Sequence, residues 1–267
     1  MVRQVNSVTV TDRRAAPPVG EPVTLTSVSK VFGRGSSAVR ALDQVSLEVP
    51  PGEFTCLIGA SGCGKSTLLS LVAGLEQPTS GEVSTGGARV AFMFQEPALF
   101  PWLTAAGNVE LALRARGIGK AERRQRTGEL LDTVHLTGFG GKRPHQLSGG
   151  MRQRVALARA LAQDADVLLM DEPFGALDAM TRDVLHDELD RICAERQLTV
   201  LFVTHNVREA VRLGDRVVVL SSRPGRVIAE FDVPIERPRR IDSAPVAELA
   251  AKVTDRLREE MSRDVNR

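Results

Sequence analysis

Residues 59–66 read GASGCGKS, and their types and spacing are those of a loop that binds phosphate groups. Glycines allow successive backbone N–H groups to turn toward an anion without clashes from Cβ atoms. Lys65 adds a positive charge for the β- and γ-phosphates, and Ser66 offers a hydroxyl oxygen to Mg²⁺. The alternative, a glycine-rich turn with a chance lysine, does not explain the strand-like stretch before it and the helical one after it. The residues assigned to the triphosphate are Gly59, Ala60, Ser61, Gly62, Cys63, Gly64, Lys65, Ser66 and Thr67.

Two carboxylates and a histidine follow apolar stretches farther along the chain. Asp171 and Glu172 come directly after VLLM, and His205 comes directly after LFVT. Because the carboxyl ends of parallel strands converge at one edge of a sheet, these side chains are expected near the triphosphate. We assign Asp171 to Mg²⁺ through water, Glu172 to orienting and deprotonating the attacking water, and His205 to the γ-phosphate. The remaining histidines lack this context and are interpreted as structural: His135, His145 and His186.

A second glycine-rich stretch, LSGGMRQR at 147–154, looks like the start of a helix. The N-terminus of a helix is an anion site, but this one has no lysine and the chain already has a phosphate loop upstream. One chain contains one copy of each stretch, so a site that uses both needs two chains. The alternative is a helix capped by Ser148 with glycines in its first turn.

The elements that must position these residues follow from the hydropathy pattern. FTCLIG and DVLLM are continuous apolar runs typical of buried central strands, whereas VTLTSVSKVF and VSLEV alternate like strands of a half-exposed sheet. Residues 104–135 are helical in pattern, and further helices are expected after Ser148, over about 179–195 and from Ala244. Alternating strands and helices predict an α/β fold, with a mainly parallel central sheet, an antiparallel β lobe at its start and a helical subdomain.

Three segments are expected along the chain. Residues 1–21 are polar and predict a flexible N-terminal tail. Residues 22–240 are expected to form the main domain, with the helical subdomain at about 97–163, and residues 241–267 a C-terminal helical tail. RPG at 223–225 predicts a tight turn between two strands.

Composition and charge argue against some classes of protein. The 267 residues include 35 basic and 33 acidic side chains, and a net charge of +2 gives no general basis for binding nucleic acid. The clusters at 123–126 and 237–240 are local exceptions, interpreted as solvated faces or contacts with a protein partner. No apolar run approaches the roughly 18 residues of a membrane span, so contact with a membrane is expected through a partner.

The ordered motifs resemble those of the ATP-binding subunits of ABC transporters over about residues 23–233. LSGGMRQR resembles the signature sequence of that family, FQEP at 94–97 its glutamine loop, GALD at 175–178 its D-loop, and His205 its switch histidine. The resemblance implies a P-loop NTPase of ABC type, and a head-to-tail homodimer that holds two ATP molecules between its subunits. The residues that would contact the ATP held by the other subunit are Ser148, Gly149, Gly150 and Asp178.

Two further nucleotide contacts rest on the same resemblance. Phe32 stands where tyrosine is frequent in the family, and its ring face can still stack on adenine. Gln95 is implied to contact the Mg²⁺ or the attacking water, so the implied metal site consists of Ser66, Gln95 and Asp171. The implied catalytic set is Lys65, Gln95, Glu172 and His205.

Phe100, Trp102 and Leu103 form an apolar run in a loop-like stretch that contains the only tryptophan of the chain. We interpret this run as the rim of a groove that receives a helix from a membrane subunit. A buried core element is the alternative.

Three stretches, FQEPALFPWLT, FGALD and SSRPGRV, resemble the branch of ABC importers that serves nitrate, taurine and aliphatic sulfonates. This resemblance implies an ATPase subunit at the cytoplasmic face of the bacterial cell membrane, bound peripherally to two integral membrane permease subunits. An extracytoplasmic solute-binding protein would act with them indirectly. The competing interpretation is a non-transport ABC ATPase, such as an iron–sulfur cluster assembly ATPase.

Overall fold

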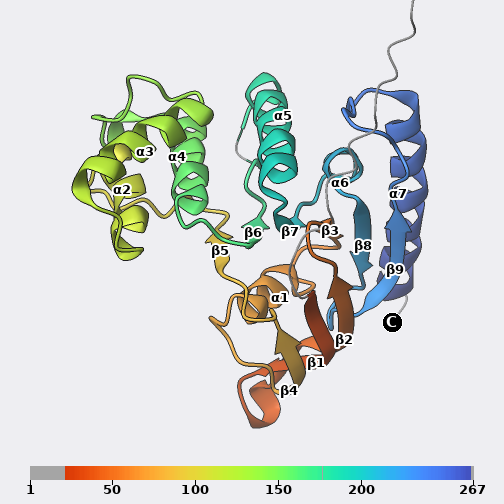
Figure 1. Cartoon of the computed structure of the whole chain (residues 1–267). Helices are drawn as coiled ribbons and strands as arrows, with labels where there is room; N and C mark the ends of the chain where they lie inside the picture. Colours follow the sequence, from red (N-terminus) through yellow and green to blue (C-terminus); the bar gives the residue numbers. More distant parts are fainter. Residues whose placement is uncertain (1–21, 176, 266–267) are drawn as a thin grey trace, which may run out of the picture.

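The computed structural model describes residues 22–175 and 177–265, and its centre is a six-stranded sheet with the order β5-β6-β7-β3-β8-β9 (Figure 1). Neighbouring strands from β5 to β8 are parallel, and β9 is antiparallel to β8. The prediction of a mainly parallel central sheet is therefore confirmed. The strands are β3 (Phe54–Ile58), β5 (Val90–Met93), β6 (Val167–Asp171), β7 (Thr199–Val203), β8 (Arg216–Leu220) and β9 (Val227–Asp232).

A second sheet is antiparallel and has the order β2-β1-β4. It consists of the first two strands of the chain and β4, which follows α1, and it corresponds to the antiparallel lobe expected from the alternating pattern. Its position beside the start of α1 (Lys65–Val72) is visible in the lower part of Figure 1. The strands are β1 (Val23–Phe32), β2 (Val39–Val49) and β4 (Ser80–Ser84).

Alternate residues of the central strands pack into two different cores. On β3, Phe54, Cys56 and Ile58 belong to the core that includes residues of helices α2 to α7. Leu57 lies in the other core, between the central sheet, α1 and the antiparallel sheet. Side chains on a strand point to opposite faces in turn, so five-residue apolar strands are buried on both sides.

The helical part is the group of helices at the left of Figure 1, and it contains α2 (Ala105–Ala115), α3 (Lys120–Thr133) and α4 (Gly149–Leu161). The Thr104 side chain caps α2 by accepting a hydrogen bond from the Gly107 N–H at 3.0 Å. All three helices lie within residues 97–163, the range predicted for the helical subdomain. The exact bounds of that subdomain remain a prediction. The predicted flexible tail, 1–21, lies outside the described residues.

Three helices follow the α4 segment: α5 (Ala179–Arg196), α6 (Val207–Leu213) and α7 (Ala244–Val265). The sequence pattern missed α6 because its seven residues follow an apolar strand almost directly. The available signal was Asn206 with Glu209 three residues later, a capping pattern. The Asn206 side chain indeed accepts the N–H groups of Arg208 and Glu209.

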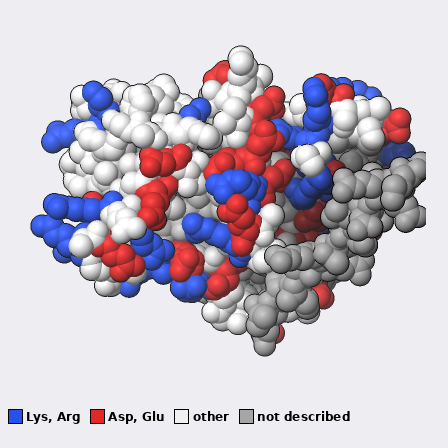
Figure 2. Space-filling model, turned by 45° about the horizontal axis from the view of Figure 1, so that its top comes forward, with Lys and Arg blue, Asp and Glu red and all other residues white. Residues whose placement is uncertain are grey.

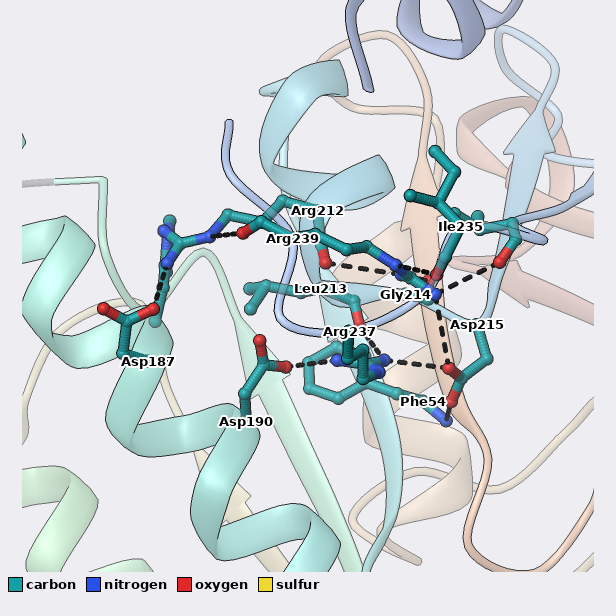
Figure 3. Close-up of polar contacts among 12 residues, drawn as sticks. Phe54, Asp187, Asp190, Arg212, Leu213, Gly214, Asp215, Ile235, Arg237 and Arg239 are labelled. Atoms are coloured by element: carbon teal, nitrogen blue, oxygen red, sulfur yellow. Dashed lines mark hydrogen bonds and ion pairs between the residues drawn. The ribbon is translucent and has the colours of Figure 1, made fainter. Parts of the chain in front are cut away.

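The interpretation of residues 237–240 as a solvated or partner-binding cluster is wrong for Arg239, which is buried, whereas Arg237 and Arg240 are exposed. The Arg239 side chain is only 3% exposed, and its guanidinium donates to backbone carbonyls around the ends of α6 and β9 (Figure 3). Arg237 forms ion pairs with Asp190 and Asp215. Arg237 and Arg239 attach the segment after β9 to the protein body, and Arg240 has the most exposed side chain of the three.

Charged side chains of both signs are interspersed over the face shown in Figure 2, as the near-neutral net charge predicts. Within the described residues, no helix has both the length and the hydropathy required to cross a membrane.

Candidate active site

A cavity of about 390 Å³ opens at the carboxyl end of β3, where the phosphate loop leads into α1. Its lining combines the loop with Phe32, Gln95, Glu172 and Arg223. These residues come from the antiparallel sheet, the segments after β5 and β6, and the turn after β8. The structure therefore brings most of the predicted ATP residues to one place.

The phosphate loop has a backbone shape that requires glycine. Gly64 precedes α1 in the left-handed region, with φ of 105°. A Cβ atom at Gly64 would lie 2.8 Å from the Ala41 carbonyl oxygen, inside contact distance. The Lys65 ammonium donates to the carbonyls of Gly59 and Ala60, at 2.9 Å each. The charge is thus held over the loop, where an incoming phosphate would meet it.

Cys63 belongs to the loop but presents no reactive thiol. Its side chain is buried, and burial raises the pKa of the thiol even though the Lys65 charge acts in the opposite direction. A Cβ at Gly59 would lie 2.8 Å from the Cys63 Sγ atom, so the sulfur fills the space under the loop. The Cys63 N–H donates to the Ala60 carbonyl at 3.3 Å, so in this structure both the thiol and the N–H of Cys63 are turned to the loop itself.

Asp171 ends β6 beside the first turn of α1. Burial raises the pKa of Asp171, the hydroxyl of Ser66 opposes this by hydrogen bonding, and the charge of Glu172 adds to it. A buried carboxylate and a hydroxyl next to a phosphate loop are oxygen ligands of the kind Mg²⁺ takes, together with phosphate oxygens and water. No group of three or more His, Cys, Asp or Glu side chains that could hold a metal ion occurs among the described residues. Asp171 and Ser66 together fit a Mg²⁺ ion whose other ligands are phosphate oxygens and water.

Glu172 and His205 form a pair at the end of β6 and β7. Glu172 Oε2 lies 3.1 Å from His205 Nδ1. The backbone of Glu172 has a φ of 44°, in the left-handed region that costs a residue other than glycine on the order of 1–3 kcal/mol. Its N–H donates to the Val203 carbonyl at 2.9 Å, which helps to hold this conformation. Glu172 lines the cavity and His205 does not, so the pair joins a cavity residue to the exposed imidazole that follows β7.

Gln95 is connected to α4 by contacts that the sequence did not indicate. The buried amide of Gln153 donates to the Gln95 carbonyl at 2.8 Å. The Arg159 guanidinium donates to the carbonyls of Pro97 and Ala98, at 2.8 Å each. Gln95 itself lies in the cavity lining, so the cavity and α4 are joined through this segment.

Ser148 begins α4, and its hydroxyl accepts the N–H of Met151 at 3.2 Å. Asp178 begins α5 in the same way, accepting the N–H of Thr181 at 3.0 Å, and this contact lowers the pKa of its carboxyl. A Cβ at Gly150 would lie 3.0 Å from a methyl carbon of Leu177. The signature sequence and the D-loop are thus neighbours. None of Ser148, Gly149, Gly150 and Asp178 is among the described residues that line the cavity.

Comparisons with known proteins agree with this geometry. The model of the ABC transporter family matches residues 42–175. An aliphatic sulfonates import ATP-binding protein of Mesorhizobium japonicum is 48% identical over 81% of this chain and 82% of its own length. The chain belongs to the ABC transporter family. Its members of this type are ATPases coupled to transport, and this chain is accordingly an ATP-binding ATPase subunit.

Other relatives of this ABC ATPase are similarly close. A nitrate import ATP-binding protein of Synechocystis is 46% identical, with 78% of this chain and 81% of that protein covered. A taurine import ATP-binding protein of Burkholderia pseudomallei is 47% identical, with 79% and 84% covered. Among solved structures, a dimeric ATP-binding cassette in a post-hydrolysis state, bound to ADP and Pi, is 36% identical with a TM-score of 0.74. It covers 80% of this chain and 100% of its own.

Arg223 is a cavity residue of this ABC ATPase that sequence reasoning missed. Its Nε and Nη2 atoms donate to the Gly62 carbonyl at 3.2 and 3.1 Å. The same turn is attached to β2, because the Gly225 N–H donates to the Ala41 carbonyl at 2.9 Å. RPG indicated a turn correctly, but only the folded chain brings that turn against the phosphate loop.

The predicted docking residues of the ABC ATPase lie away from the nucleotide cavity. Trp102 is 68% exposed, so the alternative of a buried core element is wrong for it. Its ring lies 5.4 Å from that of Phe100, and Phe100 is anchored because the Asn108 side chain bonds both its N–H and its carbonyl. Phe100 also lines an apolar groove of about 690 Å³ between the central sheet and the helical part, whereas Leu103 is half-buried beside it.

Proposed function

We propose that this chain powers an ABC importer for a sulfonate, taurine, nitrate or a related small solute. The observation that carries the proposal is the sequence identity of 46–48% to three ATP-binding proteins named for import of these solutes, over about four fifths of each chain. The proposed partners are a second copy of this chain, two integral membrane permease subunits and, indirectly, an extracytoplasmic solute-binding protein. The proposed location is the cytoplasmic face of the membrane.

In the proposed reaction, ATP binds with its phosphates in the loop at 59–67 and its adenine against Phe32. Lys65 neutralises phosphate charge. Ser66, Asp171 and Gln95 would hold Mg²⁺, which supplies positive charge against the triphosphate when bound. The contact between Ser66 and Asp171, and the place of Gln95 in the cavity lining, support this assignment.

Hydrolysis is assigned to the pair of Glu172 and His205. Glu172 accepts a proton from the attacking water and so orients the water toward the γ-phosphorus. As an imidazolium, His205 would donate from Nδ1 to the Glu172 carboxylate and from Nε2 to the γ-phosphate. The 3.1 Å contact and the exposure of the imidazole support these roles.

The second half of each site is proposed to come from the other subunit of a head-to-tail dimer. Ser148, Gly149 and Gly150 would direct their N–H groups at the γ-phosphate, and Asp178 would lie beside them. The γ-phosphate adds contacts only in the closed dimer, so ATP favours closure and hydrolysis allows opening. The dimeric form of the similar cassette supports this arrangement.

The movement is proposed to reach the membrane subunits through the segment that follows Gln95. The apolar groove and the exposed Trp102 supply a surface for a helix of the permease. Both are continuous with the segment that Gln153 and Arg159 attach to α4.

The test is to purify the tagged chain from mild-detergent extracts of its host's membranes and to identify the chains that copurify. The proposal expects two integral membrane subunits, and expects ATP hydrolysis by the reconstituted complex to rise with a solute-binding protein loaded with taurine, an alkanesulfonate or nitrate. Copurification with a soluble iron–sulfur scaffold instead would support the assembly ATPase. Stimulation by none of the three solutes would remove the solute assignment.

A further inference from the structure

A chain of buried polar groups lies behind the catalytic pair and takes no part in binding nucleotide. Thr204 follows β7, His186 lies in α5, and Glu209 and Arg212 lie in α6; their exposed fractions are 2%, 0%, 5% and 4%. Buried polar groups of this kind are costly unless each has a partner. Their arrangement therefore needs a physical account beyond the structural role first given to His186.

The protonation of His186 follows from its two neighbours. The Arg212 guanidinium lies 2.6 Å from His186 Nδ1 and can only donate, so Nδ1 accepts. The proton of the neutral imidazole is then on Nε2, which donates to Glu209 Oε1 at 2.8 Å. The His186 ring lies between the Arg212 guanidinium, which also pairs with Asp183 and Asp187, and the Glu209 carboxyl group. The ring thus has one tautomer and one orientation.

One arm of this unit reaches the backbone on both sides of His205. The Thr204 hydroxyl donates to the second carboxylate oxygen of Glu209. The same hydroxyl accepts the N–H of Asn206 at 3.0 Å. His205 is exposed, but the residues before and after it are thereby attached to a buried carboxylate.

The other arm reaches the segment that holds Glu172. The ring of His186 meets the ring of Phe174 edge to face, with centroids 5.2 Å apart and an angle of 66°. Phe174 is 1% exposed and lies two residues after Glu172, whose backbone is in the left-handed region. A fixed His186 ring therefore supports the segment in which Glu172 adopts this conformation.

The unit is anchored at its far end as well. Arg212 also donates to Asp187 at 2.6 Å and to the carbonyl of Arg239 at 3.2 Å (Figure 3). Arg239 in turn belongs to the segment after β9 that is attached to the protein body. The guanidinium that fixes the His186 tautomer is thus itself held from two directions.

We infer that His186, Glu209 and Thr204 form a positioning unit that sets the distance between Glu172 and His205. This inference rests on the hydrolytic roles proposed for those two side chains. The contact between His186 and Glu209 joins two segments: His186 packs on Phe174 beside Glu172, and Glu209 bonds Thr204 beside His205. Removing His186, Glu209 or the Thr204 hydroxyl should therefore shift Glu172 or His205 relative to the other. Misplacement of a catalytic group by about 1 Å is enough for large losses in rate.

The sharpest variant is Thr204→Val, which keeps nearly the same side-chain shape and removes only the hydroxyl. We expect its kcat to fall by on the order of tenfold, with the KM for ATP changed little, because the cavity is untouched. Thr204→Ser restores the hydroxyl and should recover most of the loss, and His186→Gln, which offers a donor and an acceptor, should recover more than His186→Ala. Thr254→Val is the matched control, since the Thr254 hydroxyl bonds a carbonyl within α7.

A double-mutant cycle separates positioning from loss of stability. In the His205→Ala background, Thr204→Val should cause little further loss of kcat, because its effect acts through His205. An unchanged kcat for Thr204→Val, or the same loss with and without His205, would overturn the inference. If His205→Ala and Glu172→Gln themselves hydrolyse ATP normally, the proposed hydrolytic roles fail first, and this inference with them.

Discussion

Two helix N-termini of this ATPase present backbone N–H groups, and they differ in what surrounds them. α1 starts at a buried lysine inside a cavity, beside a carboxylate and the Glu172–His205 pair. α4 starts at an exposed serine that caps its own helix, next to the start of α5 and outside the cavity lining. The first has the Lys65 ammonium over its loop inside the cavity, whereas the second lies outside that cavity lining and has beside it Arg152, whose guanidinium donates to the Leu147 carbonyl at 2.7 Å. The difference supports a division of labour in which α4 acts on a phosphate held by another copy.

The largest effect is expected from removing the proposed base of the α1 site. Glu172→Gln should lower the rate of ATP hydrolysis by about 10²–10⁴-fold, since the amide cannot accept the proton. ATP binding should persist, and the variant should accumulate as a dimer with ATP in size-exclusion chromatography. If the variant hydrolysed ATP at a rate close to that of the unmodified protein, Glu172 would not be the base that activates water at the α1 site.

A substitution at Gly149 tests whether the α4 site acts between copies. A side chain there would approach only Arg152, at 3.9 Å, so Gly149→Asp should fold normally and even favour the helix start. Its charge would repel a phosphate presented by another subunit, and hydrolysis should fall by on the order of 10²-fold. Gly141→Asp is the matched control because a Cβ there meets nothing within 4 Å.

Mixing two inactive variants gives the clearest contrast between the sites. Lys65→Ala loses the α1 site and Gly149→Asp the α4 site, so a mixed dimer of the proposed kind contains one complete site. Mixing the purified variants should therefore restore measurable hydrolysis. A mixture that stays inactive, although the variants exchange subunits, would contradict completion of the site by a second copy.

A smaller effect is expected at the edge of the α1 site. Arg223→Ala removes the hydrogen bonds to the Gly62 carbonyl, which are worth about 1 kcal/mol, so the Kd for ATP should rise several-fold. Arg223→Lys should lie between this variant and the unmodified protein. Titration with a fluorescent ATP analogue measures both. An unchanged Kd would mean that the turn after β8 does not support the loop.

The smallest effect on hydrolysis by the isolated subunit is expected at Trp102. Trp102→Glu lies outside both sites and should leave that hydrolysis nearly unchanged, whereas assembly with the permease and solute-driven transport should be lost. Phe139→Glu, at another exposed aromatic, is the control. Normal transport by the Trp102 variant would remove the docking role.

The sequence was sufficient to predict site residues where a functional motif directly adjoins a clear strand or helix pattern. The loop before α1, and the apolar strands that lead to Asp171 and His205, could be predicted because their neighbours in the chain define them. The contacts of Arg223 with Gly62, and of Arg239 with Val211 and Arg212, could not be predicted, since these partners are far away in the sequence. The arginines of 237–240 look like surface residues by composition, and the carbonyls that bury Arg239 come together only when the chain folds.

The attachment of residues 95–98 to α4 has a mechanical consequence. One helix carries Ser148 at its start, Gln153 one turn later and Arg159 near its end. In the proposed dimer, a rotation of α4 that moves Ser148 relative to the other subunit would also move Gln95 relative to the nucleotide cavity, because Gln153 holds the Gln95 carbonyl. We therefore expect the tilt of α4 to differ between the empty and the ATP-bound protein.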